Sequence, residues 1–129
     1  MNFNYFNMFA NVFPLLLLIA SFAVVSSVEF NLDSFKTDVV NDDRVWLVEF
    51  YSTMCGSCQE FSAVWKKLDQ SMRSISTAQI NIDEPHGMEI AKALDVLDEG
   101  IPNVRLLNSR QKPNGISIMT GTNLIKGTD

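Results

Sequence analysis

Cys55 and Cys58 are the only cysteines of the 129-residue chain, and they lie three positions apart in the run Cys-Gly-Ser-Cys. The run stands between an apolar segment and a helical pattern, so Cys55 is expected at the start of a helix. Free N–H groups and the positive end of the helix dipole lower the pKa of a thiol there. Cys55 can then attack as a thiolate, and Cys58, one turn later, can close a disulfide and release a mixed-disulfide partner. Gly56 is expected to keep the loop tight because it has no Cβ.

Two other uses of the cysteine pair have to be weighed. A structural zinc site needs about four ligands, and the single histidine, His86, leaves the set too small. A purely structural disulfide stays open as an alternative, although a bridge over so short a loop constrains little chain entropy. No metal and no cofactor are expected.

The elements around this pair alternate between strands and helices. Continuous apolar and β-branched residues predict a central strand over 45–51, buried on both faces. Asp33 or Ser34 is expected to cap the first helix. In order, the prediction is a strand over 28–32, a helix to Val40, the strand over 45–51, a helix to about Arg73, a strand over 78–82, a helix over 88–97, and strands over 104–107 and 116–119. This order predicts an α/β fold in which helices cover the sheet, with the final two strands antiparallel because their connection is short.

Apolar spacing predicts the buried faces of the two longer helices. In the helix after the cysteines the inward set is Phe61, Val64, Trp65, Leu68 and Met72. In the following helix it is Ile90, Ala91, Leu94 and Leu97.

The beginning of the chain has a different composition. Residues 1–27 contain no charged side chain. Their apolar run continues to Val25 and is followed by Ser26 and Ser27. Val25 and Ser27 suit the −3 and −1 positions before a signal-peptidase cut. We therefore expect a signal peptide over 1–27 and one domain over 28–129. An uncleaved membrane anchor is the alternative, although the apolar segment from Phe9 to Val25 has 17 residues and a membrane span needs roughly 20. Either segment directs the domain to an oxidising compartment.

All ten basic and fifteen acidic residues follow that segment, and the net charge is −5. Binding to nucleic acid requires a basic surface that neutralises phosphates. A nucleic-acid partner is therefore not expected, and a membrane partner is expected only if the N-terminal segment stays attached.

The stretch from Val48 to Cys58, Val-Glu-Phe-Tyr-Ser-Thr-Met-Cys-Gly-Ser-Cys, resembles the "VEFYAPWCGHC" of protein disulfide isomerases in the thioredoxin superfamily. Residues 30–40, 80–83 and 100–102 resemble the opening strand and helix, the third strand and the cis-proline turn of that family. The resemblance implies a thioredoxin-like fold with a central mixed sheet flanked by helices. The family's C-terminal helix is expected to be short or missing.

By that resemblance Cys55 is the nucleophile, Cys58 the resolving thiol, and Glu49 the buried acid that moves a proton to or from Cys58. Burial in an apolar strand would raise the pKa of a lone carboxyl group, whereas a solvent-facing Glu49 is the alternative. Pro102 is implied to be cis, and the backbone of Ile101 to bind an extended substrate. Met54 takes the place of an aromatic residue and can bind peptide loosely.

Three positions depart from the family pattern near the site. Ser57 replaces the histidine of the Gly-His pair, which predicts a higher Cys55 pKa and a more reducing couple than in Gly-His members. Gln79 replaces a lysine often paired with the buried acid, which predicts a still higher pKa for Glu49. Asn103 replaces the threonine after the cis-proline.

Two functions follow from these observations. The first is a thiol–disulfide oxidoreductase, similar to protein disulfide isomerase, acting on cysteine-containing proteins in the endoplasmic reticulum lumen or outside the cell. The second is a thioredoxin-like binding or chaperone module without turnover.

Overall fold

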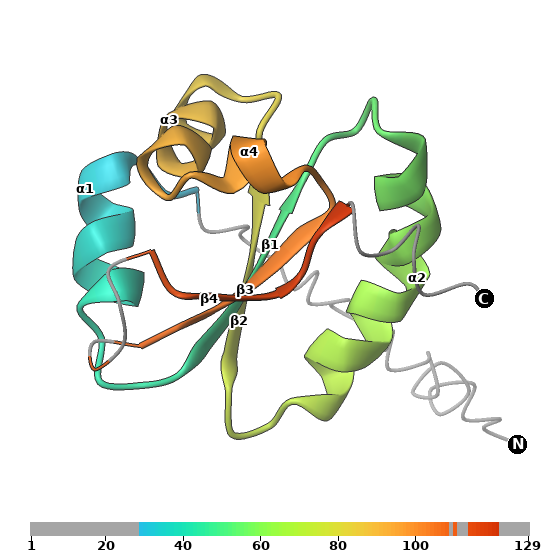
Figure 1. Ribbon diagram of the computed structural model, residues 1–129. Coiled ribbons are helices and arrows are strands. Elements are labelled where there is room, and N and C mark those ends of the chain that lie inside the picture. Colours follow the sequence, from blue (N-terminus) through green and yellow to red (C-terminus); the bar gives the residue numbers. More distant parts are fainter. Residues whose placement is uncertain (1–28, 109, 111–113, 122–129) are drawn as a thin grey trace, which may run out of the picture.

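The computed structural model describes residues 29–108, 110 and 114–121, which build a four-stranded sheet with helices on both faces (Figure 1). The strands are β1 (Trp46–Tyr51), β2 (Ser76–Asn81), β3 (Asn103–Leu107) and β4 (Ile116–Met119), in the spatial order β2-β1-β3-β4. β1 runs parallel to β2 and antiparallel to β3, and β3 is antiparallel to β4. The predicted mixed sheet and the antiparallel final pair are therefore confirmed.

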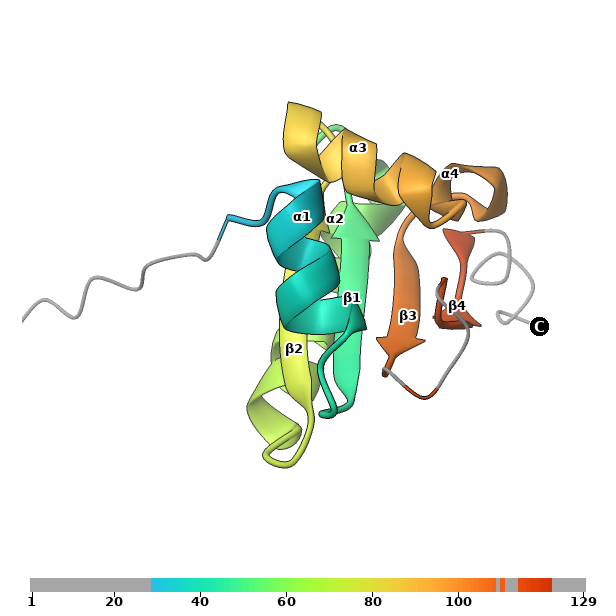
Figure 2. The same ribbon diagram turned by 90° about the vertical axis from the view of Figure 1, so that its left-hand side faces the viewer.

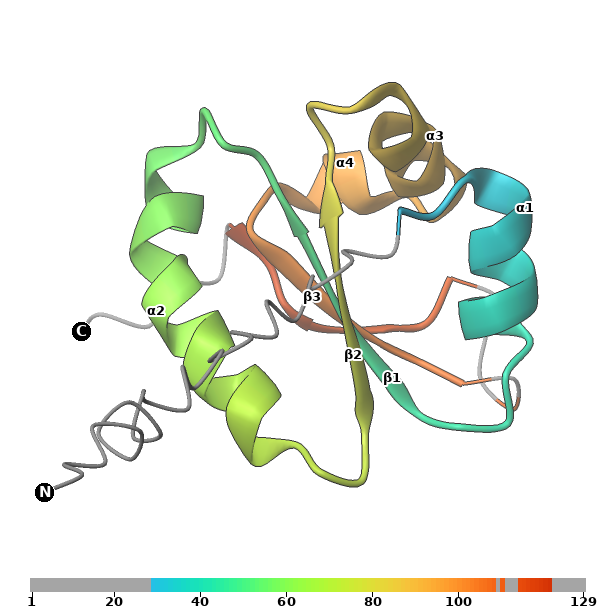
Figure 3. The same ribbon diagram turned by 180° about the vertical axis from the view of Figure 1, so that it is seen from behind.

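The helices are divided between the two faces of the sheet, as Figures 2 and 3 show. One face is covered by α1 (Leu32–Phe35), its π-helical continuation η1 (Lys36–Val40) and α3 (Pro85–Ala93), with the short α4 (Val96–Glu99) beside it. The other face is covered by α2 (Gly56–Ser71). α2 is the helix that begins directly after Cys55.

Each face of the sheet has its own hydrophobic cluster. The larger cluster lies on the side of α1 and α3, and β1 contributes Val48 and Phe50 to it. The smaller lies under α2, where Leu47 packs with Phe61 and Trp65. β1 is therefore buried on both faces, as its continuous apolar sequence predicts.

The first predicted strand is wrong for its described residues, because residues 29–31 form no strand. The Asn31 side chain instead accepts the N–H of Ser34 at 2.8 Å, while Ser34 Oγ accepts the N–H of Asn31 at 3.0 Å. This reciprocal pair is a capping box, which commits the chain to a helix from Leu32 onward. The cap is Asn31 rather than the expected Asp33 or Ser34.

Two predicted helix positions also differ. The helix expected over 88–97 is broken near Asp95, which has a left-handed backbone with φ 57°. The break turns Leu97 outward, whereas Ile90, Ala91 and Leu94 are buried as predicted.

In α2 the buried stripe is Cys58, Phe61 and Trp65. Val64 lies at the border of this stripe and is exposed. Phe61 and Trp65 are buried as predicted, whereas Cys58 was not included in the expected face.

Two other expectations fall outside the described residues. They are the signal peptide or anchor over 1–27, and any final helix over 122–129. Among the helices that the structure does describe, none has the length and apolar character that a membrane span needs.

Candidate active site at the start of α2

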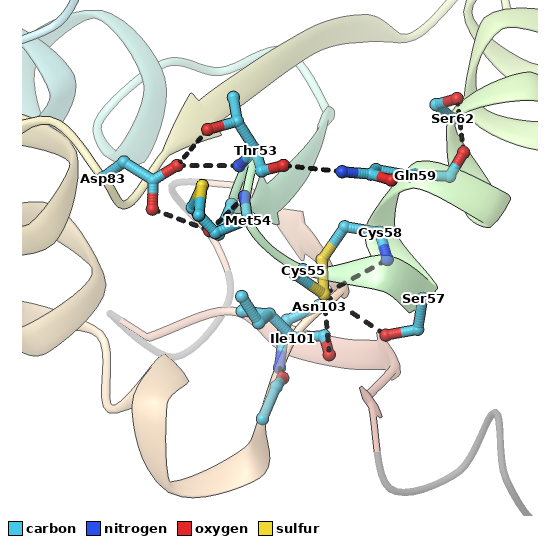
Figure 4. The surroundings of a disulfide bond; sticks show 12 residues. Thr53, Met54, Cys55, Ser57, Cys58, Gln59, Ser62, Asp83, Ile101 and Asn103 are labelled. Atoms are coloured by element: carbon cyan, nitrogen blue, oxygen red, sulfur yellow. Dashed lines mark hydrogen bonds between the residues drawn. A yellow bond between two sulfur atoms is a disulfide. The ribbon is translucent and has the colours of Figure 1, made fainter.

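Cys55 is the N-cap of α2, and it is joined to Cys58 in a disulfide (Figure 4). The Cα atoms of the pair are 5.2 Å apart. Cys58 lies in the first turn with 3% of its surface exposed, whereas Cys55 is only half-buried. Cys55 is therefore the more accessible of the two cysteines.

The Cys55 sulfur has three polar neighbours. It accepts the N–H of Cys58 at 3.2 Å, so the sulfur itself caps the helix. Ser57 Oγ lies 3.2 Å away. A disulfide sulfur carries no hydrogen, so the Ser57 hydroxyl is the donor in this state. The third neighbour is the carbonyl oxygen of Ile101, 4.0 Å from the sulfur.

Ile101 and Pro102 form the opposite wall of the site, and the peptide bond between them is cis, as expected. Pro102 is buried and Ile101 is half-buried. Gly121 lies against this loop, and a Cβ there would collide with the Ile101 backbone. The structure thus brings the loop to the cysteines from a segment 46 positions away in the chain.

A polar network that sequence reasoning missed supports this loop from below. Asn103 Nδ2 donates to Glu99 at 2.9 Å, and the buried Arg105 forms an ion pair with Glu99 at 3.2 Å. Arg105 also donates to the carbonyl oxygen of Asn114 at 2.6 Å. Glu99 is thus held by two partners on β3, although its side chain remains partly exposed.

The ionisation of Glu99 reflects this setting. Burial alone would raise its pKa, but hydrogen bonds from Asn103 and Ser117 and the charge of Arg105 together lower it. Glu99 therefore stays ionised beneath the cis-proline loop. The signal available in the sequence for this network was Arg105, a basic residue inside the otherwise apolar strand predicted over 104–107.

Glu49 lies near the middle of β1 with 1% of its surface exposed, so the solvent-facing alternative is wrong. By strand alternation it shares the α2 side of the sheet with Leu47. Burial raises its pKa, and the hydrogen bond from Gln79 Nε2, at 2.6 Å, offsets part of that rise. The expected direction of the pKa shift is confirmed.

Two loop residues have contrasting surroundings. Met54, directly before Cys55 in the chain, is 87% exposed. Gly56 was expected to avoid a steric clash, but a Cβ at that position would meet no atom within 4 Å. That explanation for Gly56 is wrong, because the first turn of α2 is open to solvent.

The sequence pattern assigned no contact to Asp83, which directly follows the strand predicted over 78–82. Its carboxylate accepts hydrogen bonds from Ser52 and Thr53, in the loop that leads to Cys55. Within the described part of the chain, no group of three or more His, Cys, Asp or Glu side chains could hold a metal ion.

Comparison with known proteins agrees with this geometry. A model of the thioredoxin family matches residues 26–126. Human protein disulfide-isomerase A6 is 26% identical over 85 residues, and protein disulfide isomerase-like 2-3 of Oryza sativa subsp. japonica is 28% identical over 85 residues. The matches cover 65% and 66% of this chain but only 18% and 19% of those relatives.

Two solved structures share the fold. One is a chain from work on the thiol resolving mechanism of a yeast mitochondrial 1-Cys peroxiredoxin, with a TM-score of 0.59 and 25% identity. The match covers 75% of this chain and 87% of the solved chain. The other is the thioredoxin Mala s 13 of Malassezia sympodialis, with a TM-score of 0.60, 20% identity, and coverage of 74% and 83%.

Proposed function

Because the chain belongs to the thioredoxin family, we propose that it is a thiol–disulfide oxidoreductase that acts on protein cysteines, in the manner of a protein disulfide isomerase. The observation that carries the proposal is the half-buried Cys55 sulfur at the N-cap of α2, next to the buried Cys58 and facing the cis-proline loop. A sulfur that accepts a helix N–H is stabilised as a thiolate.

The exchange runs in two balanced steps. In the reduced protein the Cys55 thiolate attacks one sulfur of a substrate disulfide, and the other substrate sulfur leaves as a thiolate. The Cys58 thiolate then attacks the Cys55 sulfur, which forms the Cys55–Cys58 disulfide and releases the substrate dithiol. Two electrons pass from the protein to the substrate. The disulfide form described above is the product, and the reverse sequence oxidises a substrate.

Glu49 is proposed as the base for the second step. Cys58 is buried and must lose its proton before it attacks. The buried Glu49 has a raised pKa, and a general base works best when its pKa lies near the working pH. Glu49 would take the proton from Cys58 during reduction of a substrate and return it during oxidation.

The substrate groove is proposed to run between Met54 and the Ile101–Pro102 loop. Ile101 holds its carbonyl oxygen 4.0 Å from the Cys55 sulfur. A peptide joined to that sulfur would therefore lie next to the Ile101 backbone. Met54 is flexible and exposed, so it can contact varied side chains of a bound peptide.

The compartment is proposed from the N-terminal segment. A signal peptide over 1–27 would deliver the domain to the endoplasmic reticulum lumen or out of the cell, where disulfides form and persist. The relatives named as protein disulfide isomerases support this proposal.

Two assays on the purified protein test the function: reduction of insulin by a thiol donor, and recovery of activity from scrambled ribonuclease. We expect activity in the wild type, loss in Cys55→Ser, and no change in Ser71→Ala, a serine variant at the far end of α2. A wild type inactive in both assays that still binds unfolded peptide would favour the non-catalytic binding module.

A further inference from the structure

The loop that leads to Cys55 is hydrogen-bonded to the carboxylate of Asp83, which follows the neighbouring strand β2. Asp83, just beyond β2, accepts hydrogen bonds from Ser52 Oγ at 2.7 Å, from the backbone N–H of Thr53 at 2.7 Å and from Thr53 Oγ1 at 2.6 Å. Ser52 Oγ in turn accepts the N–H of Met54 at 3.0 Å. Figure 4 shows Asp83 facing Thr53 from the side opposite to α2.

The first turn of α2 holds the same loop from the other side. Gln59 Nε2 donates to the carbonyl oxygen of Thr53 at 2.8 Å, and the N–H of Cys55 donates to the carbonyl oxygen of Ser52 at 3.3 Å. Both polar groups of the Thr53 backbone are therefore occupied. The residues between β1 and α2 have little freedom to move relative to either element.

This fastening determines where the reactive sulfur lies. The sulfur caps α2 only while the Cys55 backbone holds it 3.2 Å from the N–H of Cys58. We propose that Asp83 is a positioning residue for Cys55, holding Ser52 and Thr53 so that the sulfur remains at the helix N-terminus. This inference rests on the proposed oxidoreductase function, and it assigns Asp83 no contact with substrate.

The chemistry of the contacts supports this role. Hydrogen bonds to an ionised carboxylate are stronger than those between neutral groups. The bonds from Thr53 and Ser52 hold the pKa of Asp83 below its ordinary value, so the acceptor remains charged at neutral pH. An asparagine would offer one acceptor oxygen and would turn N–H groups towards Thr53.

Asp83 could instead act on Cys55 only through its negative charge, and the two roles predict opposite changes in Cys55 reactivity. A negative charge near a thiolate disfavours the thiolate, so an acid that acted only through its charge would raise the Cys55 pKa. Its removal would then speed alkylation of Cys55. A positioning residue predicts the reverse, because a looser loop weakens the contact between the sulfur and the helix.

The test measures alkylation of reduced Cys55 as a function of pH, together with the reduction potential against glutathione. We expect Asp83→Asn to raise the thiol pKa and to slow alkylation at pH 7 by about threefold to tenfold, since one pKa unit changes the thiolate fraction about tenfold. Asp38→Asn, at an exposed acid on η1, removes the same charge and should match the wild type.

Thr53 provides a matched pair with Asp83 left intact. Thr53→Val removes the hydroxyl at constant shape and should slow alkylation, whereas Thr53→Ser keeps the hydroxyl and should match the wild type. Because the hydroxyl that Thr53→Val removes acts through its hydrogen bond to Asp83, the double variant of Thr53→Val with Asp83→Asn should be no slower than Asp83→Asn alone. Near-UV circular dichroism verifies that each variant is folded.

The outcomes separate this inference from the function on which it rests. Alkylation that is unchanged or faster in Asp83→Asn, or equal rates for Thr53→Val and Thr53→Ser, overturns the positioning role while the wild type remains active. A wild-type Cys55 that reacts no faster than free cysteine, with no insulin reduction, overturns the proposed function and this inference with it.

Discussion

Gln79 donates a 2.6 Å hydrogen bond to the carboxyl group of Glu49, and the two residues lie directly opposite each other in the parallel pair of β1 and β2. The amide is neutral, so it stabilises the ionised carboxyl less than a cation would. Burial therefore outweighs the hydrogen bond, and the Glu49 pKa stays raised. A buried carboxyl group with a raised pKa holds its proton to a higher pH than an exposed carboxyl group does.

Replacing Glu49 by glutamine should separate stability from activity. The folded state binds the Glu49 proton more tightly than the unfolded state, whose pKa is about 4.5, so ionisation costs folding free energy as the pH rises above that value. Glu49→Gln should therefore be more stable than the wild type at pH 7, with no such gain below about pH 4.5. Release of substrate by Cys58 should slow by about tenfold or more.

Urea unfolding at the two pH values and single-turnover release of a mixed disulfide would measure these effects. Glu60→Gln, at an exposed acid on α2, is the control and should change neither quantity. Unchanged release in Glu49→Gln would contradict the role of Glu49 as a base.

Replacing Gln79 by lysine should lower the Glu49 pKa, because a cation opposite the carboxyl favours its ionised form. The pH at which Cys58 releases substrate half-maximally should move to lower values, and Gln79→Met, which brings no charge, should not produce that shift. The pH profile of single-turnover release checks the prediction. If Gln79→Lys and Gln79→Met shift the pH profile equally, packing at this position and not charge determines the profile.

Ser57 should tune the redox couple through its contact with the Cys55 sulfur, at 3.2 Å. Ser57→His places a cationic donor there and should make the reduction potential less negative, with about 30 mV for each 1.4 kcal/mol of thiolate stabilisation. Ser57→Ala removes the donor and should make the potential more negative. Equilibration with glutathione measures both, and a shift of the same sign in the two variants would refute the contact.

Arg105 should matter more for stability than an arginine on the surface. The Arg105 side chain is 4% exposed in its ion pair with Glu99, whereas Arg44 is 65% exposed in its pair with Asp42. Arg105→Met should lower the free energy of unfolding by about 2–4 kcal/mol, because polar groups stay buried without their partner. Arg44→Met should cost less than about 1 kcal/mol. Equal losses in denaturant unfolding would contradict this difference.

Two glycines should respond oppositely to alanine. A Cβ at Gly87 would collide with the backbone of Asn81 at the end of β2, so Gly87→Ala should destabilise the fold by about 1–3 kcal/mol. A Cβ at Gly56 meets open space in the first turn of α2, so Gly56→Ala should be neutral or stabilising by up to about 1 kcal/mol. Thermal unfolding of both variants measures the two changes in stability. Comparable losses of stability in Gly87→Ala and Gly56→Ala would contradict the prediction.

The sequence predicted those parts of the structure that depend on local pattern. The nearly continuous apolar run of β1 predicted a strand buried on both faces, and the position of Cys55 between that run and a helical pattern predicted the start of α2. The cis peptide before Pro102 followed from family resemblance alone, since most X–Pro bonds are trans.

The parts that could not be predicted depend on distant partners or on single side chains. The contacts of Asp83 with Thr53 join residues 30 positions apart. The ion pair of Arg105 with Glu99 needs a turn that brings the two back together. A single left-handed residue, Asp95, divided a helix whose apolar spacing was continuous.

The N-cap of α2 is a sulfur atom rather than the usual oxygen, so helix capping and electron transfer depend on the same atom. A thiolate is a stronger acceptor than a disulfide sulfur, and reduction should tighten the cap. In the thermodynamic cycle that joins folding to reduction, any extra stability of the reduced protein appears as greater oxidising power of its disulfide. A substitution that stabilises that first turn more in one redox state than in the other therefore also changes the reduction potential.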